Sequence, residues 1–334
     1  MVGVTTRRIA WGGGTAEICS TAGMLTDAEF HLGDRRVRPL ARAPWHAADP
    51  VVAGEPGHVR VLGGEFVCLP FGSAPVPVDA AAGWRIAAAP NEPPHGPPAD
   101  LEWTFPDPPG DDSARLVLDL HSDADVRRLE RTVRGIPGDT GLEFELTVHA
   151  RRAHRSPVGL HPILRLPAAG EHLRISARFG EGLTYPGTLD GGSGLLHPAA
   201  SFSDLRAVPA RKGFVDLAVL SSSDPPREEV VQLLDARSPI VVHSSGGYRV
   251  EVHWDDALLP SVLLWVSDRH LSGMPWGGSY RGLGVEPIAS AFDLPAGVSL
   301  GSNPIAARGV ATSLAFDPRE ATVVRSAVLV KDTT

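Results

Sequence analysis

The chain has 334 residues, of which 43% are hydrophobic and 21% charged, and its formal net charge is −8. This composition is typical of a globular protein with a sizeable core, and the lack of a basic run or basic helix argues against a nucleic-acid partner. Its two cysteines are too few for a disulfide framework or a zinc cluster.

The chain also shows no sign of export or of a membrane span. The N-terminus lacks the apolar core of a secretory signal peptide. The longest apolar stretch, residues 257–266, contains a proline and is too short to cross a bilayer. We therefore expect a cytoplasmic protein, monomeric or homodimeric, that does not interact with membranes.

The dominant hydrophobic period along the chain is two, which is typical of half-buried β-strands. In chain order, the alternation covers residues 114–121, 126–135, 141–150, 172–180, 214–220 and 248–254. Turn residues at 33–34, 136–141 and 244–247 predict hairpins. No apolar helical stripe exceeds about three turns, so few helices are expected. The pattern predicts an all-β fold, a large antiparallel β-sandwich, formed by residues 1–334 as one domain.

A long Pro/Ala-rich stretch, residues 73–100, separates two groups of predicted elements. Long loops in compact domains are often functional. Within this stretch, "PPHGPP" (93–98) surrounds His95 with two pairs of prolines, which fix φ and donate no backbone hydrogen bond. His95 is either an ordinary loop residue or an imidazole that the prolines hold in place without sheet hydrogen bonds.

Two further residues stand out by their context, His161 in "GLHPILRLP" and Glu286 in "YRGLGVEPIAS". Each directly precedes a proline, which favours extended backbone at the end or edge of a strand. Glu286 lies among apolar residues, where a carboxylate is costly unless it faces a cleft or a hydrogen-bond partner. Such surroundings raise a carboxyl pKa towards values that suit a general base. The alternatives are a structural histidine and a buried ion pair.

Motifs for cofactors and metals are missing from the sequence. There is no dinucleotide-binding GxGxxG after a strand, no phosphate-binding P-loop, no HExxH and no CxxC. Residues 121–125, "HSDAD", fit either a metal site or a strand end that runs into a turn of solvated acids. We expect neither a metal ion nor a cofactor.

Four segments together resemble the signature segments of the aldose 1-epimerase family, within the galactose mutarotase-like superfamily. In chain order they are "LGGEFVCLPFG" (62–72), "NEPPHGPPADLEW" (91–103), "GLHPILRLP" (159–167) and "YRGLGVEPIAS" (280–290). The resemblance extends from about residue 10 to residue 318, where the closing "SLAFDP" takes the place of the family's last strand. It implies a β-supersandwich with a sugar site in its concave face and an isomerase that interconverts α and β anomers.

The resemblance also implies roles for single residues. Glu286 would take the proton from the anomeric hydroxyl as general base, and His161 would protonate the ring oxygen as general acid. His95 would hydrogen-bond the sugar near its ring oxygen. The partner would be a small-molecule sugar, and no cofactor would be needed because only protons move.

Two further substrate-binding residues are proposed from the resemblance. Asp216 is the best match for the family's sugar-binding aspartate, and Asp235 is the alternative. Trp276 lies between a proline and a glycine just ahead of the late glutamate segment, and it would either stack on a sugar ring or anchor its loop.

The sequence departs from the family pattern at two positions. Leu62 stands where hexose-phosphate members carry an arginine, and Ile163 stands where the family favours an aromatic residue. A non-catalytic carbohydrate-binding protein on the same fold is therefore the alternative function. A glycoside hydrolase or lyase ranks third, since hydrolases need two carboxylates and only Glu286 is a convincing candidate.

Overall fold

The structure, a computed structural model, describes residues 4–72, 74–85, 93–108, 110–189, 192, 194–222 and 225–333. Its regular structure is predominantly β, and its three largest sheets are antiparallel throughout. The described α-helices, α1 (Gly57–Arg60) and α2 (Ala296–Leu300), are about one turn each. The expectation of few helices is therefore confirmed. No helix in the described residues is long and apolar enough to span a membrane.

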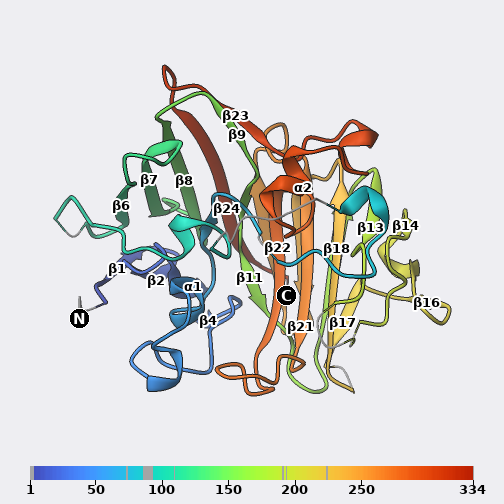
Figure 1. Ribbon diagram of the computed structural model, residues 1–334. Helices are drawn as coiled ribbons and strands as arrows, with labels where there is room; N and C mark the ends of the chain where they lie inside the picture. The colour runs from blue at the N-terminus through green and yellow to red at the C-terminus, as the bar shows by residue number, and fades with distance from the viewer. Residues whose placement is uncertain are drawn as a thin grey trace.

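The three main sheets are named here by their strands, and Figure 1 shows their arrangement. Sheet I has the order β1 (Thr6–Trp11), β2 (Gly14–Cys19), β3 (Leu25–Leu32), β4 (Arg35–Val37). Sheet II has the order β14 (Ser201–Phe202), β13 (Glu181–Thr184), β18 (Arg227–Leu234), β21 (Ser261–Asp268), β22 (Arg281–Ala289), β10 (Val158–Leu160), β5 (Val67–Cys68), with β11 (Ile163–Arg165) also on β22. Sheet III has the order β17 (Val219–Ser221), β12 (His172–Arg178), β19 (Arg237–Ser244), β20 (Tyr248–Trp254), β24 (Thr322–Asp332), β8 (Gly141–Ala150), β7 (Val126–Gly135), β6 (Ser113–Asp119).

Short elements complete the fold. Two small ladders pair β15 (Val208–Pro209) with β16 (Phe214–Val215), and β9 (His154–Ser156) with β23 (Leu314–Phe316). Short 3₁₀ turns lie at η1 (Pro50–Val52), η2 (Ala82–Trp84), η3 (Pro97–Ala99), η5 (Leu205–Ala207) and η6 (Ala306–Arg308).

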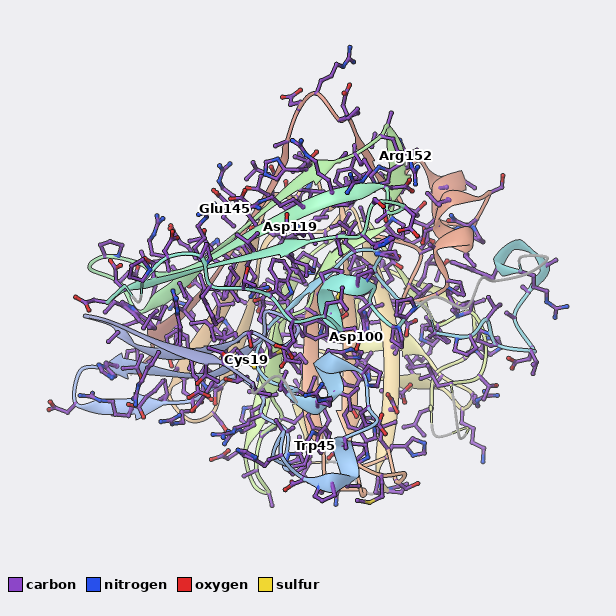
Figure 2. All side chains as sticks on the ribbon, turned by 60° about the vertical axis from the view of Figure 1, so that its left-hand side comes forward. Cys19, Trp45, Asp100, Asp119, Glu145 and Arg152 are labelled. Carbon is purple, nitrogen blue, oxygen red and sulfur yellow. The ribbon has the colours of Figure 1, made fainter. Side chains whose placement is uncertain are left out.

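Sheets II and III pack face to face and bury one apolar cluster, as the alternating pattern predicts. On β22, Leu283 and Val285 belong to this cluster, and so do Val250 and Val252 on β20 in sheet III. The other face of sheet III carries the polar residues of the alternation; Figure 2 shows Glu145 on β8 among them. Sheet II differs, because its second face is also covered, by a separate apolar cluster built from loops.

Most of the predicted strands coincide with observed ones. Strands β7, β8 and β20 begin and end as the alternation indicates. The prediction for residues 214–220 is wrong in part, because the strand breaks at Asp216 into β16 and β17. The last strand was also misplaced: residues 313–318 contain only the short β23, and the long β24 follows it.

A fully buried ion pair joins sheet III to the segment that leads into β5. The guanidinium of Arg131 on β7 donates to both carboxylate oxygens of Glu65. Both side chains are almost completely excluded from solvent. A buried pair of this kind is tolerated only when the partners satisfy each other closely. The pair therefore fixes the position of the backbone just ahead of Phe66.

Candidate active site

A pocket of about 650 Å³ opens on the face of sheet II that points away from sheet III. Strand registry forms its floor, because side chains two residues apart share a face. Leu263 on β21 pairs with Glu286 on β22, and Trp265 pairs with Val230 on β18. All four residues line the pocket. The period of two therefore places the carboxyl group of Glu286 on this floor beside apolar side chains.

Glu286 is held at the centre of this floor with its side chain 2% exposed. Burial, and next the nearby charge of Asp293, raise its pKa well above the usual value. Its Oε1 atom has no hydrogen-bond partner in the described residues. Gly284, two residues before it on the same face, leaves room for the carboxyl group, because a Cβ there would overlap Oε1. Glu286 is thus a desolvated carboxyl group with an unused acceptor.

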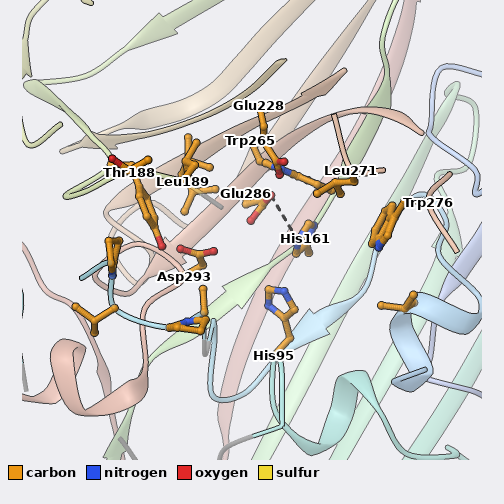
Figure 3. A pocket seen from close by; sticks show the side chains of 18 of the residues that line it. His95, His161, Thr188, Leu189, Glu228, Trp265, Leu271, Trp276, Glu286 and Asp293 are labelled. Carbon is orange, nitrogen blue, oxygen red and sulfur yellow. Dashed lines mark hydrogen bonds and ion pairs between the residues drawn. The ribbon is translucent and has the colours of Figure 1, made fainter. Parts of the chain in front are cut away.

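His161 faces Glu286 from the break between β10 and β11. Its Nε2 lies 3.5 Å from Oε1 of Glu286, as the dashed line in Figure 3 marks. Its backbone N–H donates to the carbonyl of Phe66 (2.9 Å), whose ring stacks on the imidazole at 4.5 Å. Burial, and next the neighbouring His58, lower the pKa of His161 to about 3. The pair therefore consists of a neutral imidazole beside a carboxyl group that favours its protonated form.

His95 also reaches this pocket, as Figure 3 shows, and its ring lies 5.1 Å from that of His161. Its backbone is in the left-handed region, with φ 60°, and Gly96 follows at φ 74°. The expectation that the prolines hold the imidazole is only partly right. The His95 N–H donates to the carbonyl of Gly72 (2.7 Å), and the His95 carbonyl accepts from the N–H of Leu69 (3.2 Å). Backbone bonds to residues 69–72, together with the prolines, hold the loop.

A third histidine, His58 on α1, completes a cluster of imidazoles that the sequence did not indicate. Its ring stacks on Phe66 at 5.5 Å and meets His95 edge-on at 5.2 Å. Burial lowers its pKa to about 4. Phe66 is thus packed between two imidazoles, and burial holds the cluster in its uncharged form. Nothing in "GEPGHVR" (54–60) marks this histidine, because only the tertiary contact gives it a role.

Aromatic side chains form one wall of the pocket. Trp276 lies at its rim, in contact with Trp45 and Tyr280 at ring distances of 5.1 Å each. Trp265 stacks on Tyr280 and donates its Nε1–H to Glu228 (2.7 Å). Trp276 therefore both lines the pocket and packs in its loop, so the two readings of this residue are compatible.

The predicted aspartates lie elsewhere. Asp216 is exposed, and its Oδ1 accepts the backbone N–H groups of Ala218 (2.7 Å) and Val219 (3.2 Å). Asp235 is exposed in the turn between β18 and β19, with φ 50°. Neither lines the pocket. The structure does not bring Asp216 into this pocket, because the residue stabilises the break between two short strands.

Acids that the sequence analysis did not single out line the pocket. Asp293, Glu228 and Asp79 line the pocket together with Glu286. Asp293 follows β22 by four residues, and Glu228 lies on β18 on the same face as Val230. Alternation on β18 could have identified Glu228, since the spacing to Val230 is two. No sequence pattern marks Asp293 or Asp79, which lie outside strands.

No group of three or more metal-ligating side chains with suitable geometry exists among the described residues. The candidate segment at 121–125 is a solvent-exposed turn in which His121 Nδ1 lies 2.8 Å from Asp123. This arrangement agrees with the reading of a strand end that runs into a turn.

No protein-family model and no curated protein sequence matches the chain. Its structure does match solved structures over nearly its whole length. A protein from Escherichia coli K12, provisionally described as an aldose 1-epimerase, has a TM-score of 0.66 at 16% identity, covering 99% of this chain and 100% of that one. The GalM/aldose epimerase homologue from C. elegans has a TM-score of 0.66 at 13% identity, with the same coverage.

A third structure, a galactose mutarotase-like protein from Lactobacillus casei, has a TM-score of 0.60 at 12% identity and covers 98% of this chain and 100% of that one. At such low identities the similarity is one of fold. The chain has the galactose mutarotase-like β-sandwich fold, as the four sequence segments predicted.

Proposed function

We propose that this protein is an aldose 1-epimerase that interconverts the α and β anomers of a sugar. The observation that supports it best is the His161–Glu286 pair, 3.5 Å apart, buried at the floor of an open pocket. An imidazole and a carboxyl group with unused polar atoms are the two groups that proton transfer at an anomeric centre requires. A cytoplasmic location and a single domain belong to the same proposal.

The number of protons that the pair holds fits the roles of general base and general acid. At neutral pH the pair holds one proton, because burial favours protonated Glu286 and neutral His161. Transfer of that proton from Oε1 to Nε2 gives a carboxylate base and an imidazolium acid without changing the total charge. The separation of 3.5 Å is longer than a hydrogen bond, as is common for catalytic pairs without a bound substrate.

The reaction then proceeds in balanced steps. Glu286 takes the proton of the anomeric hydroxyl, C1=O1 forms as the bond from C1 to the ring oxygen breaks, and His161 protonates the ring oxygen. Rotation about C1–C2 and closure on the other face return both protons. His95, with its Nδ1 unpartnered in the described residues, would donate to or accept from the sugar near its ring oxygen. No electron is transferred, so we propose no cofactor.

The test is to dissolve single anomers of a panel of aldoses and follow their exchange by proton NMR with and without protein. We expect acceleration for at least one aldose, and a loss of about 10²–10⁴-fold in His161→Ala, the range for general acid–base groups. Sugar binding by calorimetry without any acceleration would instead identify a non-catalytic carbohydrate-binding protein.

Glycoside hydrolysis is the second candidate because the pocket, unlike the sequence motifs, contains further carboxylates. Asp293 lies close enough to Glu286 for its charge to raise the pKa of that group. A hydrolase places two carboxyl groups across the scissile bond. Release of nitrophenol from a panel of aryl glycosides, lost in both Asp293→Asn and Glu286→Gln, would favour this function over epimerisation.

A further inference from the structure

Among the described residues that line the pocket, the side chains with carboxyl, ammonium or guanidinium groups are all acids. They are Asp79, Glu228, Glu286 and Asp293, and no lysine or arginine is among the described lining residues. The stretches outside the described residues contain neither lysine nor arginine in their sequence. Arg211 reaches the rim from an exposed position, where its guanidinium donates to the hydroxyl of Thr188 (3.1 Å). Leu62 forms part of the wall.

The imidazoles do not supply the missing positive charge. Burial lowers the pKa of His58 to about 4 and that of His161 to about 3, and it lowers the pKa of His95 well below its usual value. All three rings are therefore neutral near pH 7. A phosphate or carboxylate on the substrate would meet no cation at the floor of the pocket, although such groups are normally bound by charge-assisted hydrogen bonds.

The positions of the acids around the catalytic pair indicate which substituent they would face. In Figure 3, His161 and Asp293 lie on opposite sides of Glu286. In a sugar, C1 is bonded both to the ring oxygen and to C2. With the anomeric hydroxyl at Glu286 and the ring oxygen at His161, a pose with C2 on the Asp293 side of Glu286 places the C2 substituent towards Asp293.

The unpartnered oxygen of Glu286 is independent support for a polar ligand in the pocket. Glu286 is 1% exposed, and its Oε1 points into the pocket without a hydrogen-bond partner in the described residues. A buried polar atom without a partner costs about 1–3 kcal/mol, which a ligand donor can recover. A cationic donor between Glu286 and Asp293 would also offset the repulsion that their charges would otherwise experience.

We propose that the preferred substrate is a 2-amino-2-deoxyaldose, whose ammonium group is held by Asp293 beside Glu286, while phosphorylated sugars and uronic acids are rejected. This inference rests on the proposed epimerase function and names its substrate class. The ammonium would also favour the ionised form of Glu286, because it opposes the charge of Asp293 that raises the pKa of Glu286. The substrate itself would thus help to produce the general base.

The experiment compares anomer exchange of glucosamine, glucose, glucose 6-phosphate and glucuronate by proton NMR at about pH 6, below the pKa of about 8 for amino groups near electronegative atoms. We expect kcat/KM for glucosamine to exceed that for glucose by about tenfold or more, as for hydrogen bonds to charged groups. The two anionic sugars should fall at least about tenfold below glucose.

Asp293→Asn should reduce the ratio of kcat/KM for glucosamine to that for glucose to near one. Asp34→Asn is the matched control, because it removes the same charge in an exposed turn between β3 and β4, away from the pocket. The control should keep both the ratio and the rates. An unchanged ratio in Asp293→Asn would overturn the assigned contact.

The failure of this inference is distinguishable from that of the proposed function. If glucose or an anionic sugar is exchanged as fast as glucosamine, the substrate class is wrong while the epimerase stands. If the anomers of no aldose are exchanged, the proposed epimerase function is wrong. Calorimetric titration of the same protein with the sugars then tests the proposed ligand class. Tighter binding of glucosamine than of glucose would uphold the ammonium site, and equal binding would overturn it.

Discussion

The protein buries two acid–base pairs on either side of Phe66, and they differ in whether the carboxyl group lines a pocket. In the Arg131–Glu65 pair, both carboxylate oxygens of Glu65 accept hydrogen bonds from the guanidinium. In the His161–Glu286 pair, Oε1 of Glu286 and Nδ1 of His161 have no hydrogen-bond partner among the described residues. The first pair is closed on its partner, and the second opens into a pocket. Neither burial nor an unused polar atom separates the two pairs, because Nε of Arg131 also has no partner among the described residues. They differ in that only the carboxyl group of Glu286 lines a pocket.

The surroundings explain the difference. Arg131 reaches Glu65 from sheet III, across the packed interior, where no ligand can enter. His161 and Glu286 belong to sheet II, on the face covered by loops rather than by a second sheet. A binding site needs a rigid support and access for a ligand. The face of sheet II that packs on sheet III gives the support, and the loop-covered face gives the access.

Removing the carboxyl group of the open pair should have the largest effect on activity. We expect Glu286→Gln to reduce anomer exchange by about 10²–10⁴-fold, because the amide cannot take a proton. Unfolding in denaturant should show a free energy of unfolding at neutral pH no lower than that of the wild type, since a desolvated acid is removed. A variant that unfolds easily would indicate a structural carboxyl group instead.

Breaking the Arg131–Glu65 pair should instead lower the stability of the protein. Arg131→Met leaves Glu65 buried without its partner, and we expect a loss of about 3–5 kcal/mol in the free energy of unfolding. The matched control is the double variant Arg131→Met/Glu65→Leu, which removes both charges and should recover much of the loss. If the single variant were as stable as the wild type, the pair would not hold the segment before Phe66.

A smaller effect tests the geometry of the open pair without altering either member. Gly284→Ala places a methyl group where Oε1 of Glu286 now lies, so the carboxyl group must move. We expect kcat to fall by about ten- to a hundredfold, as for other small misplacements of a catalytic group. Gly282→Ala, on the same strand and face near Tyr280, is the control for adding a methyl group away from the carboxyl. Equal losses in both variants would point to general strain in β22.

The pH dependence of stability should show the smallest effect. The pKa of Glu286 is raised in the folded protein, so its contribution to stability is complete below its unfolded pKa and is lost as pH rises through the folded value. The stability of Glu286→Gln relative to the wild type should therefore increase as pH rises above about 4.5, by up to about 1.4 kcal/mol per unit of pKa shift. Denaturant titrations at several pH values measure this difference, and a difference that is constant with pH would contradict the raised pKa.

Much of the fold follows from the sequence because the period of two is a local signal. It located β7, β8 and β20 and identified the sandwich. It did not predict the break at Asp216. The break is stabilised by the Asp216 side chain, which accepts two backbone N–H groups, and the hydrophobic pattern of the sequence does not reflect such bonds. It also could not show which face of sheet II is open, since both faces of β22 are apolar apart from Arg281 and Glu286.

The residues of the candidate site also divide into those that the sequence indicated and those that it did not. His95, His161 and Glu286 were found from short motifs, and all three line one pocket, although their roles remain a proposal. His58 and Asp293 were missed because each lies outside the strands and acquires its neighbours only when distant segments meet. Asp216 was chosen by its place in the chain, which does not reveal that the residue lies outside the pocket, in the break between β16 and β17.

The segment from Phe66 to Gly72 has a consequence for redesign. The Phe66 carbonyl binds the backbone of His161, the Phe66 ring contacts His58 and His161, and the Gly72 carbonyl binds the backbone of His95. All three imidazoles are thus aligned by one stretch of seven residues. Grafting this stretch from a relative would shift the three imidazoles together, so it is a natural unit of exchange for anyone wishing to alter the pocket.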